Sequence, residues 1–207
     1  VDHPLAVITD VASVKGAIFA ALADEPTSVL SRVVGGHPMA GREVSGAQAA
    51  QSNLFVDRPW VITQTPATAP QAVAVVRQLA IDLGAVPIER TVVEHDQAVA
   101  LISHTPQVVA SVLASSLVDA PQSHIDLAGQ GIRDTIRLAS SDAQLWSDIL
   151  ASNAHEVAHQ LANIAERING VVNALHAGDA ATVEQVIGSG NLGQRKLPGK
   201  HGADVRH

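Results

Sequence analysis

The segment from Gly35 to Gly41 holds the clearest set of residue types that could carry chemistry. It reads Gly-Gly-His-Pro-Met-Ala-Gly and follows an apolar run at 30–34. The run predicts a buried strand that stops at the two glycines, which would place His37 on a tight turn at the strand's end. Ligands of α/β proteins bind beyond the ends of parallel strands, and histidine transfers protons near neutral pH. His37 is therefore a candidate general base, and a solvated turn histidine is the competing interpretation.

Two more segments concentrate polar residues in apolar surroundings. Residues 9–15 read Thr-Asp-Val-Ala-Ser-Val-Lys at an expected strand-to-helix turn. The second segment reads Glu-His-Asp at 94–96 and continues to Ser-His-Thr-Pro-Gln at 103–107. His104 and Gln107 are three residues apart on the expected helix, so they share one face.

An arginine-containing segment follows at 129–137 and continues to Trp146. Arg133 and Arg137 stand four residues apart near two glycines, and Asp134 lies between them. Such a pair suits a carboxylate ligand, because the guanidinium fork binds carboxylates in a bidentate way. An ordinary ion-pair network along a helix explains the same residues.

The pattern His-Glu-x-x-His at 155–159 matches that of zinc proteases. Both histidines point away from the apolar stripe that starts at Val157, so we expect a solvated helix face and no metal site. Asp179 is a carboxylate that could complete a zinc site, which leaves a zinc hydrolase as a remote alternative.

The glycines at 188–193 match G-x-G-x-x-G letter for letter. A dinucleotide site needs a preceding strand and a long following helix, and the residues after Gly193 are too few for that unit. We therefore interpret the match as a turn after a short helix.

Composition narrows the class of protein. Of the 207 residues, 46% are hydrophobic and only 2% aromatic, so the core must consist of small aliphatic side chains in closely packed helices. The formal net charge of −7 argues against nucleic acid or an anionic membrane as a partner. There is no cysteine, no signal peptide and no run of 18 apolar residues, so a cytoplasmic enzyme or subunit is expected.

The first third of the chain alternates short apolar runs with turns, which is typical of α/β proteins. Strands are expected at 6–9, up to His37 and at 60–63. Ser13 is expected to cap a helix that runs to Leu22.

From Pro70 the apolar period changes to that of helices. Helices are predicted at 70–83, at about 94–117 with a bend at Pro106, at about 125–138, and from 141 to about 178. In the last one, apolar residues recur every three or four positions from Val157 to Leu175, a stripe that suggests dimerisation. Residues 86–88 form a strand or a linker, and the tail from Gly188 is expected to be irregular.

Together the polar segments resemble the prephenate and arogenate dehydrogenase family of tyrosine biosynthesis. The resemblance rests on T-D-V-x-S-V-K at 9–15, G-G-H-P-M-A-G at 35–41, H-D followed by S-H-x-P at 95–106, and R-D-x-x-R-x-A-x-S-D with a downstream Trp at 133–146. It implies an α/β portion, the C-terminal half of a Rossmann-type nucleotide-binding domain, followed by an all-α helical dimerisation domain. We expect these at 1–66 and 67–178, with a short helix and irregular tail at 179–207.

The resemblance also implies a reaction. Family members oxidise the ring C4 alcohol of prephenate or arogenate, pass hydride to NAD or NADP and release the ring carboxylate as CO2. His37 matches the catalytic histidine, and Ser13 matches a serine that orients the hydroxyl and that histidine. The expected substrate-binding residues are Arg137, His104, Gln107, Trp146, Asp134 and Arg133, and the expected cofactor-binding residues are Asp10, Ser13 and Lys15.

Two departures from the family pattern bear on function. The family's glycine-rich phosphate loop lies upstream of residues 9–15 and is absent from this sequence, so we expect the chain to bind NAD or NADP poorly by itself. Gln107 stands where many relatives have a second histidine, and glutamine can bond a keto or an amino group. The prediction is a homodimeric prephenate dehydrogenase, with arogenate dehydrogenase or a non-catalytic dimerisation fragment as alternatives.

Overall fold

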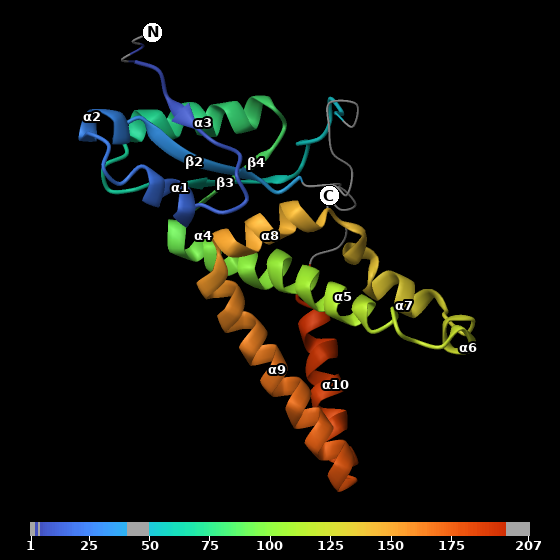
Figure 1. Cartoon of the computed structure of the whole chain (residues 1–207). Helices are drawn as coiled ribbons and strands as arrows, with labels where there is room; N and C mark the ends of the chain where they lie inside the picture. Colours follow the sequence, from blue (N-terminus) through green and yellow to red (C-terminus); the bar gives the residue numbers. More distant parts are fainter. Residues whose placement is uncertain (1–2, 4, 41–49, 198–207) are drawn as a thin grey trace. The chain divides into compact units, whose positions relative to one another are not determined.

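The computed structural model describes residues 3, 5–40 and 50–197, which form two compact units (Figure 1). Unit 1 extends to Val157 and unit 2 begins at Ala158, and each is described by itself. Gly41, the last residue of the histidine motif, lies outside the described residues.

Unit 1 contains a mixed sheet whose strands follow chain order. These are β1 (Ile8–Thr9), β2 (Val33–Pro38), β3 (Pro59–Thr63) and β4 (Val86–Arg90). β1 is parallel to β2 and β3 is parallel to β4, whereas β2 and β3 are antiparallel. The prediction that the strand stops at Gly35 and Gly36 is wrong, because both glycines and His37 pair with β3.

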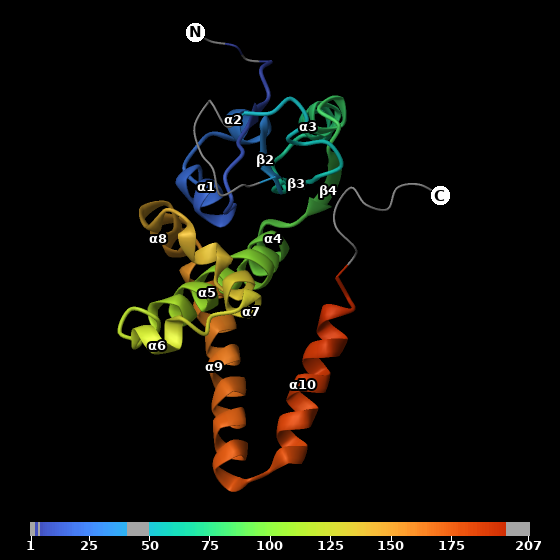
Figure 2. The ribbon, with the colours of Figure 1, turned by 90° about the vertical axis from the view of Figure 1, so that its right-hand side faces the viewer.

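The core of the sheet region is mainly aliphatic, as the composition predicts, with Trp60 as its aromatic member. Helix α3 (Pro70–Asp82) packs against β2, β3 and β4, which is visible in two views (Figures 1 and 2). Its start at a proline agrees with the preference for proline in the first helical turn. The buried cluster consists of Val34, Trp60, Ile62, Ala72, Val73, Val76, Ala80 and Ala85. The chain turns after α3 at Gly84, whose φ of 75° is one that glycine adopts readily.

Two short helices connect β1 to β2. They are α1 (Gly16–Ala21) and α2 (Thr27–Leu30). The helix expected after Ser13 is therefore present, but Ser13 makes no capping hydrogen bond to it.

A long helical stretch follows the sheet and carries several site residues. It consists of α4 (Val92–Val99), a π-helical turn η2 (Ala100–His104) and α5 (Thr105–Ser115). Thr91 and Glu94 form a capping box at its start. Near Pro106, where the sequence predicts a bend, the helix contains this π turn, which ends two residues before the proline.

By length and composition alone, residues 92–115 could cross a membrane, with a mean hydropathy of 1.4. Some of their polar side chains, however, are buried against other elements of unit 1. His95 and Asp96 bond to residues of β2 and α1, and His104 is 1% exposed. We therefore interpret the stretch as a core helix of unit 1.

The rest of unit 1 is more broken than the sequence predicts. It comprises α6 (Gln122–Ile125), α7 (Gln130–Thr135), the 3-10 turn η3 (Arg137–Ser140) and α8 (Ala143–Ser152). The single helix predicted at 125–138 is wrong, because Gly129 is extended and begins a new helix. Asp142 caps α8, accepting from the Leu145 amide. The predicted long helix from 141 is interrupted at Asn153, beyond which α9 (Ala154–Ala177) begins.

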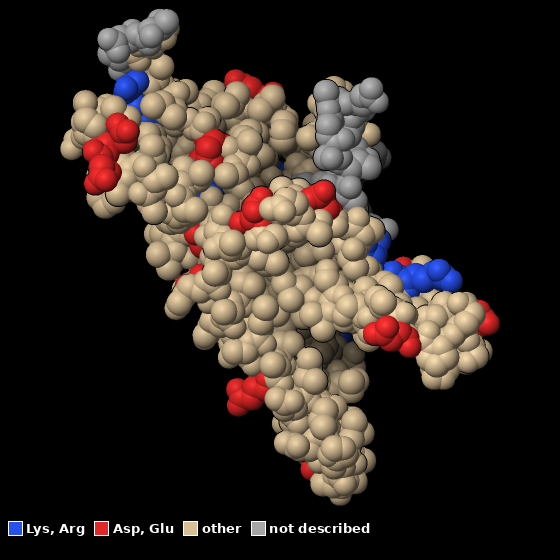
Figure 3. Space-filling model, viewed as in Figure 1, with Lys and Arg blue, Asp and Glu red and all other residues tan. Residues whose placement is uncertain are grey.

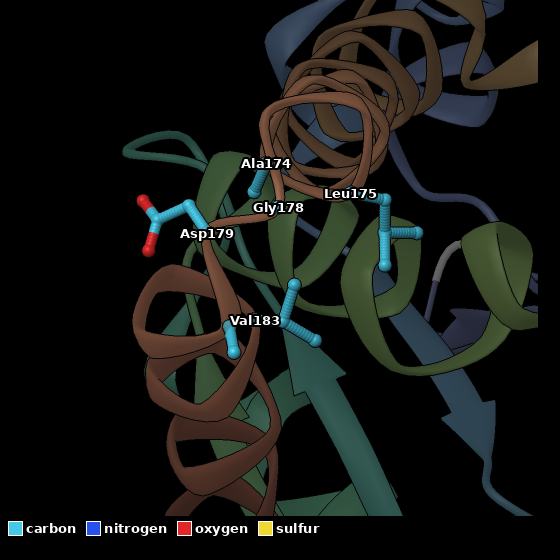
Figure 4. A pocket seen from close by; sticks show the side chains of 6 residues that line it. Ala174, Leu175, Gly178, Asp179 and Val183 are labelled. Atoms are coloured by element: carbon cyan, nitrogen blue, oxygen red, sulfur yellow. The ribbon is translucent and has the colours of Figure 1, made fainter.

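Unit 2 contains most of α9 and the helix α10 (Ala180–Gln194). Gly178 and Asp179 form the turn between them, and Asp179 caps α10 by accepting from the Thr182 amide. A cavity of about 240 Å³ lies at this turn, with Asp179 pointing away from Leu175 (Figure 4). The expectation of irregular structure from Gly188 is wrong, since α10 continues to Gln194. The glycines at 188–193 therefore lie within a helix, not in a turn.

Candidate active site

The candidate site forms at the edge of the sheet where β1 and β2 end. Because these strands are parallel, Asp10 after β1 and His37 near the end of β2 lie at the same edge. A Cβ atom on Gly35 would collide with the Thr63 side chain, and one on Gly36 with the Asp10 carbonyl. The two glycines of the motif are thus needed for close approach of β2 to its neighbours.

Lys15 links the connection between β1 and α1 to β2 by a hydrogen bond. Its side chain is fully buried, and its ammonium group donates to the Asp10 carboxylate and, at 2.6 Å, to the Gly36 carbonyl. Burial lowers the pKa of Lys15, while the carboxylates of Asp10 and Asp96 oppose this shift. The ammonium group is committed to protein atoms, which favours a supporting role for Lys15.

Asp96 of α4 caps the N-terminus of α1. Its Oδ1 accepts from the Lys15 amide at 2.9 Å and its Oδ2 from the Gly16 amide at 2.7 Å. These are donors that a helix leaves without intrahelical partners. The predicted cap by Ser13 is therefore wrong, because a carboxylate more than 80 positions away in the sequence satisfies the same amides.

A chain of three side chains runs from Asp96 to the sheet edge. His95 Nδ1 lies 2.7 Å from Asp96 Oδ1, and His95 Nε2 lies 2.8 Å from His37 Nδ1. The two imidazole rings meet edge to face, with centroids 5.1 Å apart. His95 is 1% exposed, whereas His37 is half-buried. His37 therefore forms the accessible end of the chain.

The surroundings of His37 keep it uncharged. Burial lowers the pKa of His37 to about 3, and the neighbouring His95, Lys15 and His104 side chains act in the same direction, against the opposing carboxylate of Asp10. Asp96 has its pKa raised by burial, but hydrogen bonds from His95 and two backbone amides outweigh this and hold the pKa below its usual range. At neutral pH the chain thus has a carboxylate at one end and a neutral imidazole at the other.

His95 and Asp96 are functional candidates to which sequence reasoning gave no role. The adjacent His-Asp pair was visible as part of a polar segment. Its signal was two neighbouring polar residues at the start of an otherwise apolar helix, which predicts burial with partners.

A second buried group lies further along the same helical stretch. Asn153, at the break between α8 and α9, donates from Nδ2 to the Asp96 carbonyl at 2.8 Å, and its Nδ2 lies 3.3 Å from His104 Nδ1. Burial lowers the pKa of His104, and donation from Asn153 Nδ2 to its Nδ1 would leave the ring proton on Nε2. The rings of His104 and Trp146 meet edge to face, with centroids 6.2 Å apart. The structure therefore brings His104 and Trp146 together, two of the expected substrate-binding residues.

Gln107 is buried next to these residues. Its Nε2 donates to the Leu138 carbonyl at 2.9 Å, which ties α5 to η3. The remaining amide oxygen lies 3.5 Å from the Ser141 hydroxyl.

The arginine segment lies at the surface of unit 1. Arg133, Asp134 and Arg137 are exposed, and basic atoms gather over α7 and the following turn (Figure 3). Asp134 accepts from Gln130, one helical turn earlier. Arg133 borders an open cavity of about 640 Å³ formed by α6, α7 and the turn that follows α5, in which His37 takes no part. Ser13 is half-buried and borders a separate hollow with α8.

His155 and His159 are exposed on α9, and His155 Nδ1 lies 3.1 Å from Glu156. Among the described residues no three metal-ligating side chains gather into a cluster.

The residues at the sheet edge suit one part of a nicotinamide cofactor. The Asp10 carboxylate, 24% exposed, and the Ser13 hydroxyl can bond hydroxyl and amide groups. The α1 N-terminus is already occupied by Asp96 and the Lys15 ammonium is buried, so neither is available to phosphates. The Asp10 carboxylate and the Ser13 hydroxyl therefore fit a ribose or carboxamide group of the cofactor.

Comparison with known families places both parts of the chain. The family model of the prephenate dehydrogenase nucleotide-binding domain matches residues 3–89. That of the prephenate dehydrogenase dimerization domain matches residues 91–188. Among curated relatives, prephenate dehydrogenase of Bacillus subtilis is 34% identical over 160 residues, which are 76% of this chain and 43% of the relative. A probable prephenate dehydrogenase of Streptomyces niveus is 31% identical, over 84% of this chain and 51% of the relative. The chain thus spans about half the length of these relatives.

Solved structures agree with this assignment. Arogenate dehydrogenase of Synechocystis superimposes with a TM-score of 0.79 at 30% identity, covering 93% of this chain and 70% of that one. Prephenate dehydrogenase of Aquifex aeolicus, in complex with hydroxyphenyl propionate and NAD+, gives a TM-score of 0.82 at 27% identity, with coverage of 93% and 68%. The chain belongs to the prephenate dehydrogenase family.

Proposed function

We propose that the protein oxidises prephenate with NAD or NADP and that His37 accepts the proton of the ring hydroxyl. The observation that carries this proposal is the position of His37. Its Nδ1 is held by His95, its surroundings keep it uncharged, and it is accessible at the sheet edge. A neutral imidazole whose second nitrogen keeps its lone pair can act as a general base.

In the proposed reaction the hydroxyl of the substrate lies against Nε2 of His37. As the proton leaves, the alcohol carbon becomes a carbonyl carbon and the ring carboxylate departs as CO2. The bound nicotinamide supplies the hydride acceptor. The proposed cofactor contacts are Asp10 and Ser13, while Lys15 acts indirectly by holding Asp10 against β2.

The remaining predicted residues would bind the substrate's charged groups. Arg137 is proposed for the side-chain carboxylate, because guanidinium binds carboxylates in a bidentate way. His104 and Trp146 would form a wall of the pocket, with His104 Nε2 as a hydrogen-bond donor. Asp134 and Arg133 would support Arg137 from α7.

Arogenate is the second candidate substrate. Among the structures similar to this chain is an arogenate dehydrogenase, and a cyclohexadienyl dehydrogenase of Zymomonas mobilis is 30% identical to it. Gln107 is proposed to discriminate only weakly between the two side chains, since its Nε2 donates to the Leu138 carbonyl and its oxygen lies 3.5 Å from the Ser141 hydroxyl.

We further propose a cytoplasmic homodimer that forms through the helical part of the chain. Ile168 and Leu175 of the predicted apolar stripe on α9 are exposed in the single chain. A second protomer would cover such side chains.

The proposed function is tested by following cofactor reduction with prephenate and with arogenate. The longest form of the protein that the gene encodes should be used, with NAD and NADP in separate reactions. We expect turnover with prephenate and a lower kcat/KM with arogenate. If dimers form but neither substrate is oxidised and no cofactor binds, the protein is a dimerisation module instead.

A further inference from the structure

We propose that His95 and Asp96 are positioning residues that fix the tautomer of His37 and receive its second proton during the reaction. This inference rests on the proposed function for its catalytic part. Its structural part concerns only the three side chains and stands on the two short contacts between them.

The tautomers follow from the carboxylate at the end of the chain. A carboxylate only accepts hydrogen bonds, so His95 must donate from Nδ1 to Asp96 Oδ1. A neutral His95 then has a lone pair on Nε2 and accepts from His37 Nδ1, 2.8 Å away. This leaves the lone pair of His37 on Nε2, the nitrogen directed away from His95. The geometry thus points His37's basic nitrogen toward a ligand.

Asp96 is itself held in one orientation. It accepts from the amides of Lys15 and Gly16 as well as from His95, so its carboxylate is bonded on both oxygens. The α1 N-terminus therefore fixes Asp96, Asp96 fixes His95, and His95 fixes His37. Hydrogen bonds of this kind to one ring nitrogen set the tautomer and ring orientation of a catalytic histidine.

The same chain offers a place for the proton that His37 cannot hold. Burial, Lys15 and His104 disfavour a positive charge on His37, and among the described residues the Asp10 carboxylate opposes them. When the substrate hydroxyl loses its proton, that O–H bond breaks and a bond to His37 Nε2 forms. At the same time the His37 Nδ1–H bond breaks and a bond to His95 Nε2 forms. The charge then rests on His95, next to the Asp96 carboxylate, and no electrons are exchanged.

Two substitutions separate positioning from proton transfer. His95→Gln keeps an oxygen that accepts from His37 Nδ1 but cannot take up a proton. His95→Leu removes the acceptor as well. His159→Gln, at an exposed histidine on α9, is the matched control.

The structural part is tested by nitrogen NMR of the histidine rings in this chain, without substrate or cofactor. We expect the proton of neutral His37 on Nδ1 in the wild type and in His95→Gln, and a mixture of tautomers in His95→Leu. A wild-type His37 protonated on Nε2 overturns the inference, whether or not the protein is a dehydrogenase. This measurement on the wild type stands even if a variant fails to fold.

The catalytic part is tested by kcat and KM in the longest form of the protein. His95→Leu should lower kcat about 100-fold and His95→Gln about tenfold, with KM nearly unchanged in both, because tautomer control and proton transfer act on the chemical step. A rise in KM of the same size, with no change in kcat, would contradict proton transfer from His37 to His95. Absence of turnover in the wild type would instead remove the proposed function and leave the NMR result valid.

Discussion

His37, His95 and Asp96 on one side and the arginine segment on the other both belong to the motifs shared with the family, yet they differ in burial. Around His37 the polar side chains are buried and bonded to one another, from Asp96 through His95 to the sheet edge. Arg133, Asp134 and Arg137 are exposed on short helical turns. The difference indicates that contacts within the protein orient the proposed proton acceptor His37 before a ligand binds. The charged side chains of the arginine segment are instead exposed to solvent. Substitutions in the first region should affect both stability and chemistry, whereas those in the second should affect binding alone.

The largest expected effect is the loss of the base. His37→Asn should lower kcat by about 10³-fold or more, because no neighbouring group can replace Nε2 as the proton acceptor. The measurement is cofactor reduction with prephenate, with His159→Asn as the control at an exposed histidine. Near-normal turnover would exclude His37 as the base.

Asp96→Ala should cost about 2–4 kcal/mol of unfolding free energy, since it leaves two amides of α1 and the His95 ring without an acceptor. Urea denaturation of this chain measures the change. Asp134→Ala, which removes an exposed carboxylate from α7, should stay within about 0.5 kcal/mol of the wild type. Similar losses in both variants would remove the contrast between the regions.

Two glycine substitutions should have opposite signs. Gly36→Ala should destabilise unit 1 by about 1–3 kcal/mol, because its Cβ would press against the Asp10 carbonyl. Gly131→Ala places its Cβ in open space within α7 and should stabilise by about 0.5–1 kcal/mol. Thermal unfolding of the two variants tests this. Destabilisation by Gly131→Ala would mean that the arginine segment is more tightly packed than the structure indicates.

Arg137→Ala should act on binding only. We expect KM for prephenate to rise about 10- to 100-fold, the value of a charged hydrogen bond to a carboxylate, with a small change in kcat. Arg77→Ala, at an exposed ion pair with Glu89 on the sheet, is the control. A loss confined to kcat would assign Arg137 to the chemistry instead.

Local patterns in the sequence predict much of this fold. The strand at 59–63, the helix at 70–82 and the helical stretch with an interruption near Pro106 all follow from apolar period and helix signals. The extension of β2 through Gly35 and Gly36 does not, because the need for glycine there comes from the Asp10 carbonyl and the Thr63 side chain. Those neighbours are known only once the sheet has formed.

The candidate site could likewise be predicted only in part from the sequence. The motif around His37 could be expected from residue types and the family resemblance, whereas the ring contact between His104 and Trp146 was not predicted. Asp96 as the cap of α1 could not be, because the two are some 80 residues apart and Ser13 is a plausible local cap. The break at Asn153 likewise depends on its bonds to α4 and His104, which no local propensity encodes. The roles of Ser13, Asp10 and the arginines stay predictions.

An NMR titration of His37 tests whether the folded chain by itself keeps this ring neutral, with its Nε2 lone pair available to a ligand. We predict that its ring stays uncharged on acidification until near pH 3. Because the unfolded chain would protonate this histidine near pH 6.5, the folded state binds fewer protons, and stability should fall as the pH drops between these values. His37→Asn should reduce that slope. Titration of His37 near pH 6.5 in the folded chain would show that the fold does not keep this ring uncharged.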